Sequence, residues 1–310
     1  MRQAVTNTPN TGRRRMTQRT REEIAAYLFI LPWIIGFTIF HAGTILATFV
    51  IGLFETDLLS PPKFVGLQNY ITLFTTDTRF MKALQVTTLY TLGSVPLQIL
   101  LALGLAILLN QNVAGLGIWR TLFYVPSVMS GVAIALIWQW FYHPDLGLFN
   151  TMLAEIGIKG PRWLYSQQWA LPSIIAMNVW SVGPLMLIFL AGLKGISREY
   201  YEAAAIDGAN SWQQFVGITI PLLSPQILFN TVISIIGSYQ IFSSSFVMTQ
   251  GGPNNATLTL VLHMYTNGFL KARFGYAAAI ASVLFVIILI LTVIVLRFSS
   301  SFVHYEGRQT

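Results

Sequence analysis

Cysteine is absent from the 310-residue sequence, so the chain can form neither a disulfide bond nor a thiolate metal site. Charged residues are also scarce: they make up 9% of the chain, against about 25% in an ordinary soluble domain. Hydrophobic residues account for 54%. Lipid suits such a surface better than water does, and we therefore expect an integral membrane protein.

Motifs for nucleotide, metal and acyl chemistry are missing as well. A phosphate-binding loop ends in Lys followed by Ser or Thr, but the five lysines of this chain precede Phe, Ala, Gly, Gly and Ala. No H-E-x-x-H zinc motif and no G-x-S-x-G nucleophile elbow occurs. We therefore predict no catalytic residue, no metal site and no cofactor bound by this chain, which by itself is not an enzyme.

The net charge of +7 raises the question of a nucleic-acid partner. The 18 Lys and Arg residues, however, cluster beside apolar runs, where membrane topology explains them. We predict a lipid bilayer around the chain and no nucleic acid.

Six apolar stretches are each long enough for a helix that crosses a hydrocarbon core of about 30 Å. They are approximately 25–53, 84–109, 117–142, 169–193, 221–247 and 276–298. Segments rich in Pro, Gly, Asn and Asp separate them and indicate loops or surface helices. The fold class that follows is an all-α membrane protein with about six transmembrane helices.

An even number of spans places both termini on one side, and the basic residues indicate which side. With the termini inside, the inner segments hold eleven Lys and Arg and the outer segments seven. Basic loops favour the cytoplasm, so both termini are predicted to be cytoplasmic. We divide the chain into a basic, disordered tail over 1–23, a membrane domain over 24–299 and a C-terminal tail over 300–310.

The polar side chains inside the apolar stretches are almost all neutral, for example Gln98, Asn178, Asn230 and Gln240. A carrier driven by protons or an ion gradient usually keeps an ionisable residue at membrane depth, because that group carries the coupling. The sequence therefore disfavours a self-contained secondary carrier. Any one of these amides can instead simply hydrogen-bond to a neighbouring helix.

The polar segment 194–220 predicts a pair of short helices. Ser197 is suited to cap a helix whose first turn holds Glu199 and Glu202. Gly208 follows Asp207 and can adopt the left-handed conformation that ends a helix, and a second helix is expected from Ala209 to Pro221. On physical grounds alone, such a hairpin could also lie on the lipid surface.

The same segment resembles the EAA motif of the membrane subunits of binding-protein-dependent ABC importers. The motif runs Glu-Ala-Ala, two residues, Asp-Gly-Ala, five residues, Phe, two residues, Ile, one residue, Leu-Pro. Matching positions hold Glu202, Ala203, Ala204, Asp207, Gly208, Ala209, Phe215, Ile218 and Pro221. The one departure is Ile220 where Leu is usual.

The resemblance implies that this loop is a coupling helix that docks on a separate cytoplasmic ATPase. Tyr201, directly before the motif, and Ala205, in its two-residue spacer, are added to the expected coupling residues. Several further segments resemble the sugar-importing branch and its maltose-type member. They are 64–70, 125–127, 135–138, 141–147, 249–253 and 275–279.

The family relationship also implies the partners. They would be a second permease, an ATPase dimer that binds ATP and Mg, and an extracytoplasmic solute-binding protein, assembled in a bacterial plasma membrane. The implied function is ATP-driven import of a sugar or oligosaccharide by alternating access. Import of another solute class, such as a glycerol phosphate or a polyol, stays open.

A sugar cavity needs neutral hydrogen-bonding groups mixed with aromatic rings. Two stretches at membrane depth have that composition, and relatives of the maltose type use these spans for their site. The candidate substrate-pathway residues are Asn178, Trp180, Ser181, Ser238, Tyr239, Gln240, Phe242, Ser243 and Ser244. The alternative is that the aromatic residues only pack between helices.

Overall fold

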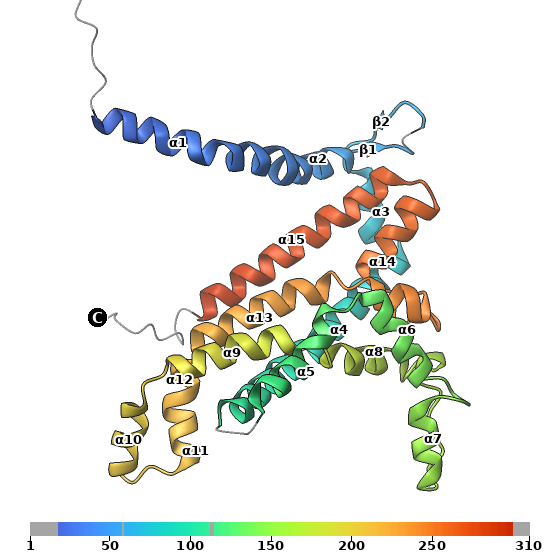
Figure 1. Cartoon of the computed structure of the whole chain (residues 1–310). Coiled ribbons are helices and arrows are strands. Elements are labelled where there is room, and N and C mark those ends of the chain that lie inside the picture. Colours follow the sequence, from blue (N-terminus) through green and yellow to red (C-terminus); the bar gives the residue numbers. More distant parts are fainter. Residues whose placement is uncertain (1–17, 58, 112–114, 300–310) are drawn as a thin grey trace, which may run out of the picture. The chain divides into compact units, whose positions relative to one another are not determined.

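The computed structural model describes residues 18–57, 59–111 and 115–299 (Figure 1). The expected C-terminal tail, 300–310, and the first part of the N-terminal tail lie outside the described residues. The fold is helical apart from a short ladder of β1 (Phe54–Glu55) and β2 (Lys63–Phe64), the one strand pair in the part of the chain that is described. Two units divide at Val50, and each is treated by itself.

The first unit is one long apolar helix. It consists of α1 (Gln18–Phe37), the π-helical turn η1 (Thr38–Ala42) and α2 (Gly43–Ile51). Tyr27 to Leu31 are five consecutive large hydrophobic residues, and at about 100° per residue they surround the helix with apolar surface. Helix α1 begins at Gln18, inside the segment for which the sequence predicted a tail.

The second unit holds two further unbroken spans, α4 (Thr78–Asn110) and α15 (Phe274–Ser299). Three more apolar stretches form bent helix pairs. They are α5 (Leu116–Val128) with α6 (Gly131–Phe141), bent by 99°, α8 (Ala170–Val179) with α9 (Gly183–Gly195), bent by 45°, and Ser211–Leu222 with α13 (Ser224–Tyr239), bent by 64°. By length and composition, the described residues supply three candidate spans, or up to six when each bent pair counts as one, in agreement with the about six that the sequence predicts. Ser211–Leu222, in the last pair, begins before the predicted stretch and also belongs to the hairpin described below.

The breaks between the paired helices have local causes in the sequence. Pro184 and Pro225 occupy the first turns of α9 and α13. Proline has no N–H to donate, so it is tolerated at the start of a helix but would break a helix that ran through its position. Between α5 and α6, Met129 is extended (φ −73°, ψ 149°), three residues after Pro126. The stretch expected to run to residue 247 also ends earlier, because α13 stops at Tyr239 and the π-helical η4 covers Ser245–Thr249.

Short elements connect the spans. They are α3 (Gln68–Thr75), α7 (Leu148–Glu155), η2 (Trp163–Tyr165), α10 (Arg198–Ile206), α11 (Ser211–Gln214), η3 (Phe215–Thr219), α12 (Ile220–Leu222), α14 (Leu260–Tyr265) and η5 (Thr266–Leu270).

Helix α4 is the central element of the second unit, and its two ends belong to different cores. Ala102 and Ala106, near its C-terminal end, are fully buried against Phe189 of α9 and Leu223. Phe80, near its N-terminal end, packs with Tyr276 and other residues of α14 and α15. At about 1.5 Å per residue, the 22 positions from Phe80 to Ala102 place the two cores about 33 Å apart.

Candidate functional site

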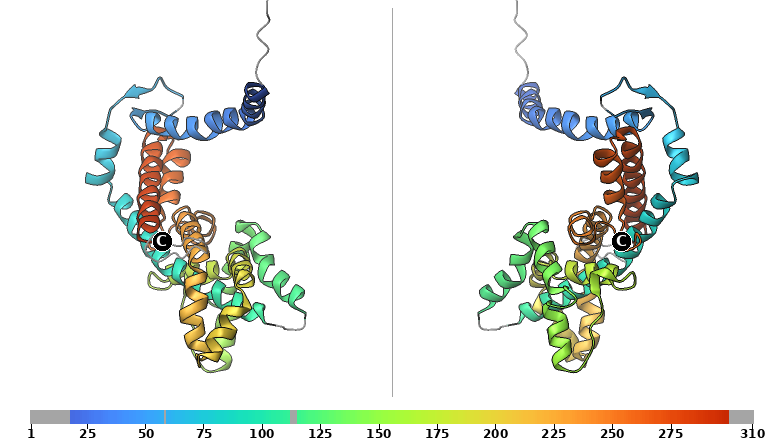
Figure 2. Two further views of the ribbon diagram at one scale, coloured as in Figure 1. Left: turned by 90° about the vertical axis from the view of Figure 1, so that its left-hand side faces the viewer. Right: turned by 90° about the vertical axis from the view of Figure 1, so that its right-hand side faces the viewer.

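The hairpin predicted from the sequence is formed by α10 and by the helical run from α11 to α12, which extend together beyond α9 and α13 (Figures 1 and 2). Ser197 caps α10 as expected, because its Oγ accepts a hydrogen bond from the Glu199 N–H at 3.3 Å. Glu199 lies in the first turn. Glu202, which was expected there too, lies one turn further along and is exposed.

Gly208 ends α10 in the left-handed conformation that the sequence predicts, with φ +83°. The Gly208 N–H donates to Ala205 O at 3.1 Å, and the Ala209 N–H donates to Ala204 O at 2.9 Å. These two bonds form a Schellman motif, which satisfies carbonyls at the helix end. The direction in which the chain leaves α10 is therefore set by the backbone at Gly208.

The second helix begins at Ser211, two residues later than expected, because Asn210 and Gln213 form a capping box. The Gln213 N–H donates to Asn210 Oδ1 at 2.9 Å, and the Asn210 N–H donates to Gln213 Oε1 at 2.8 Å. The N-x-x-Q spacing in the sequence is the signal that could have located this start.

Hydrogen bonds between the two arms fix the angle of the hairpin. The Tyr201 hydroxyl lies 2.9 Å from Thr219 Oγ1, and the Gln214 side-chain amide donates to Tyr201 O at 3.5 Å. The same amide donates to Ala209 O in the turn at 3.2 Å. Phe215 packs with Ile220 against the core at the C-terminal end of α4. Movement of the hairpin would therefore be transmitted to the spans that pack on this core.

The bend of the hairpin exposes large apolar side chains. Ile206 is 87% exposed and Trp212 is 70% exposed. The predicted coupling residues divide into exposed and half-buried sets. Exposed are Glu202, Ala203, Ala205, Asp207 and Gly208, and half-buried are Tyr201, Ala204, Ala209, Phe215, Ile218 and Pro221. Ile206 and Trp212 were not among the predicted residues, because the motif does not specify them.

Three of the predicted substrate-pathway residues hydrogen-bond to α4. Asn178 donates to the Tyr90 hydroxyl, and Ser238 Oγ donates to Thr91 Oγ1 at 3.0 Å. The Tyr239 hydroxyl lies 3.1 Å from Thr88 Oγ1. Such hydrogen bonds between helices fit the alternative given above, in which these residues serve helix packing and not substrate binding.

The remaining pathway residues are more accessible. Trp180 is 41% exposed and packs against Trp138 with ring centroids 5.8 Å apart. Gln240, directly after α13, is exposed. Phe242 stacks on Phe246 at 5.1 Å, and Ser181, Ser243 and Ser244 are half-buried. The predicted pathway thus divides into residues that hydrogen-bond to α4, of which Ser238 and Tyr239 are buried and Asn178 is half-buried, and the more exposed remainder.

Comparison with known proteins gives the family. Residues 94–304 match the family described as "Binding-protein-dependent transport system inner membrane component". The chain belongs to this family: it is the multi-pass inner-membrane permease of an ABC importer, the non-catalytic component of that machine.

Individual relatives match over nearly their whole length. The chain is 39% identical to the probable ABC transporter permease protein YesP of Bacillus subtilis, over 93% of this chain and 94% of that protein. It is 33% identical to the trehalose/maltose transport system permease protein MalF of Thermococcus litoralis, over 89% and 94%. A bacterial alginate ABC transporter, solved in complex with an alginate pentasaccharide-bound periplasmic protein, matches with a TM-score of 0.75 and 26% identity, covering 91% of this chain and 96% of that chain.

Proposed function

We propose that this chain is one of two permeases in a bacterial importer of a sugar or oligosaccharide, of the maltose type, with both termini in the cytoplasm. The α10–α12 hairpin would dock on a separate ATPase dimer that binds ATP and Mg. An extracytoplasmic binding protein would deliver the solute. Differential binding of ATP and of the loaded binding protein to two conformations would drive alternating access.

One observation carries the coupling role: the hairpin is held rigidly by its own hydrogen bonds, yet it exposes Ile206 and Trp212 at its bend. Exposed apolar side chains on a preorganised element are suited to a protein interface. The core contact of Phe215 supplies a mechanical connection from such an interface to α4 and α9.

Sugar as the solute class is supported by composition and by relatives. The relatives include permeases named for trehalose/maltose and for lactose. The accessible pathway residues are neutral polar or aromatic, which suits hydroxyl groups and apolar ring faces better than a charged solute. Trp180 and Gln240 are the residues that we place closest to the solute.

Site-specific cross-linking tests the coupling role, since the chain has no native cysteine. A cysteine at the exposed Ala205 should cross-link to the ATPase and should react with an impermeant thiol reagent only from the cytoplasmic side. Ala154→Cys, on exposed α7, is the control and should react only from outside. Labelling of position 205 from outside, or cross-linking of position 154 to the ATPase, would overturn both docking and topology.

A further inference from the structure

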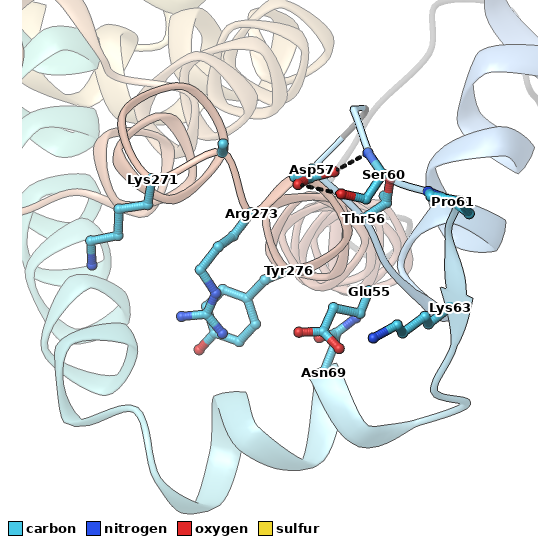
Figure 3. Close-up of a pocket in the computed structure, with 11 residues that line it drawn as sticks. Glu55, Thr56, Asp57, Ser60, Pro61, Lys63, Asn69, Lys271, Arg273 and Tyr276 are labelled. Carbon is cyan, nitrogen blue, oxygen red and sulfur yellow. Dashed lines mark hydrogen bonds between the residues drawn. The ribbon is translucent and has the colours of Figure 1, made fainter.

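A pocket of about 370 Å³ lies between the β1–β2 hairpin and the start of α15 (Figure 3). Its lining includes Glu55, Asp57 and Lys63 on the hairpin side. Lys271 and Arg273 come from the turn that precedes α15, and Tyr276 from its first turn. None of these residues belongs to the proposed coupling or solute sites.

A backbone hydrogen bond joins the two walls, and the Asn69 side chain holds the strand side of the pocket in place. The N–H of Phe274 donates to Thr56 O at 3.0 Å, and Asn69 Nδ2 donates to Gly52 O and Phe54 O at 2.9 and 3.0 Å. Gly275 is required at the joint, because a Cβ there would lie 1.8 Å from Phe54 O. The pocket is therefore preformed and does not depend on a ligand to assemble it.

In the part of the chain that the structure describes, the basic side chains of the pocket wall have no acidic partner within the pocket. Asp57 already accepts from the Ser60 and Leu59 N–H groups at 2.7 and 3.0 Å, and these bonds hold its pKa below the usual value. The guanidinium of Arg273 lies 4.5 Å above the Tyr276 ring, which leaves its N–H edges free to point into the pocket. Among the described residues, neither Arg273 nor Lys271 forms an ion pair.

The pocket and the α10–α12 hairpin occupy opposite ends of α4. Tyr276 donates to Asp77, which caps the first turn of α4, whereas Phe215 packs with the other end of that helix. If the hairpin is cytoplasmic, as proposed above, the pocket faces the outside. Leu59, 92% exposed, and Leu270, 68% exposed, adjoin lining residues in sequence and add apolar surface.

The lining carries both signs of charge, and this selects the type of partner. A phosphate headgroup or an acidic sugar would meet Glu55 as well as the cations, with like-charge repulsion. A protein surface can place a carboxylate beside Lys271 and Arg273 and keep a basic or neutral group beside Glu55. Apolar side chains next to a charged pocket are also typical of protein interfaces.

We propose that this pocket receives an acidic side chain of the extracytoplasmic solute-binding protein, whose carboxylate pairs with Lys271 and Arg273. The inference rests on the proposed function for its orientation and for the existence of that partner. Docking here would act on the Asp77 end of α4, opposite the ATPase.

The test uses the whole transporter in proteoliposomes and measures ATP hydrolysis against binding-protein concentration. Lys271→Glu with Arg273→Glu should raise the half-stimulating concentration about tenfold and leave basal hydrolysis unchanged, because rim charges act mainly on association. Lys159→Glu, an exposed lysine of the loop after α7, is the charge-matched control and should stay within about twofold of wild type. Raising the salt concentration should weaken wild-type stimulation more than that of the double variant.

One further variant and one change of lipid composition complete the experiment. Lys271→Gln changes one exposed side chain and should shift stimulation in the same direction, so it replaces the double variant if that one fails to assemble. Disappearance of the effect in vesicles without anionic lipid would show a lipid site and overturn the proposal, as would unchanged stimulation of both variants. If no binding protein stimulates the wild-type complex, the proposed function itself has failed.

Discussion

The imidazole Nε2 of His263 lies 2.8 Å from Oδ2 of Asp77, so that α14 is joined to the first turn of α4 across 186 positions of sequence. The same carboxylate oxygen accepts a hydrogen bond from the Tyr276 hydroxyl at 2.6 Å, and Oδ1 accepts from the Phe80 N–H at 3.0 Å. Asp77 therefore connects α4, α14 and α15 at the end of the bundle that carries the charged pocket.

This junction should make stability depend on pH. Burial tends to raise the pKa of Asp77, but the bonds from Tyr276, His263 and the Phe80 N–H outweigh it, and the pKa lies below the usual value. Burial lowers the pKa of His263 despite Asp77, and Arg79 and Lys271 act in the same direction. Both groups bind protons more weakly in the folded state, so their contribution is present at neutral pH and is lost as pH falls.

We expect the unfolding temperature in detergent to fall as the pH is lowered from about 7, first through His263 below its ordinary pKa of about 6.5 and then through Asp77 below its ordinary pKa of about 3.9. His263→Gln keeps a donor for Asp77 but cannot titrate, so its profile should be flatter near pH 6. Asp77→Ala should cost about 1–3 kcal/mol at neutral pH, because buried donors lose their acceptor. A His263→Gln profile parallel to wild type would rule out this residue as the source.

Gly208 provides a test of the coupling hairpin that leaves the spans untouched. No atom lies within 4 Å of a Cβ built there, so the cost of a side chain comes from the φ of +83° alone. Gly208→Val should insert normally but lose most transport, since a β-branched residue rarely adopts this conformation. Gly208→Asn, which tolerates it better, should keep more activity.

Gly195→Val is the matched control, because Gly195 lies in α9, has equal space for a Cβ and does not have a positive φ.

Glu202→Lys should also reduce transport, since it removes an exposed carboxylate that a basic groove of the ATPase could bind. Normal transport by both Gly208→Val and Glu202→Lys would contradict the coupling role.

The exposed residues at the bend should dominate the affinity for the ATPase. Trp212→Ala should weaken association by about 2 kcal/mol, or roughly thirtyfold, as expected for a central aromatic anchor. Trp140→Ala on α6 is the control, since this ring is also largely exposed, at 59%, but lies on a different element. Titration of the detergent-solubilised permeases with ATPase measures the difference, and equal affinities would place the interface elsewhere.

The six apolar stretches and the caps of the hairpin could be predicted because both are local features. Ser197, Gly208 and the residues around them determine their own backbone conformations through bonds within a few positions. The bends could have been anticipated from Pro184 and Pro225, but their angles depend on which neighbours each half contacts.

The helix pairs could not be derived from one sequence. Asn178 and Tyr90 are 88 positions apart, and nothing in either stretch states that α8 faces α4. The Thr and Tyr residues of α4 that bond to α8 and α13 were overlooked for the same reason, because they lie within an apolar stretch. The charged pocket likewise forms only because Phe274 and Thr56 meet in the folded chain.

The buried and accessible sets of pathway residues should respond differently to substitution. The sequence made Tyr239 a candidate substrate-pathway residue. The ring is only 4% exposed, and its hydroxyl bonds to Thr88, so Tyr239→Ala should instead reduce the yield of assembled complex through a cavity cost of about 3–5 kcal/mol. Tyr239→Phe, which removes only the hydroxyl, should assemble and lose about 1 kcal/mol of stability.

Of the neighbouring residues Tyr239 and Gln240, Gln240 is the one whose substitution should change the kinetics of solute uptake. It is exposed directly after α13, so Gln240→Ala removes a hydrogen-bonding side chain without leaving a buried partner unpaired in the resting protein. Loss of a hydrogen bond to a bound sugar hydroxyl would raise the KM of uptake about tenfold, with complex yield and binding-protein-independent ATP hydrolysis unchanged. Gln226→Ala, the amide at the opposite end of α13, is the control for amide loss and should leave the KM unchanged. If Gln240→Ala transports with wild-type kinetics, the solute passes along a different face of α13, and Trp180 becomes the next position to test.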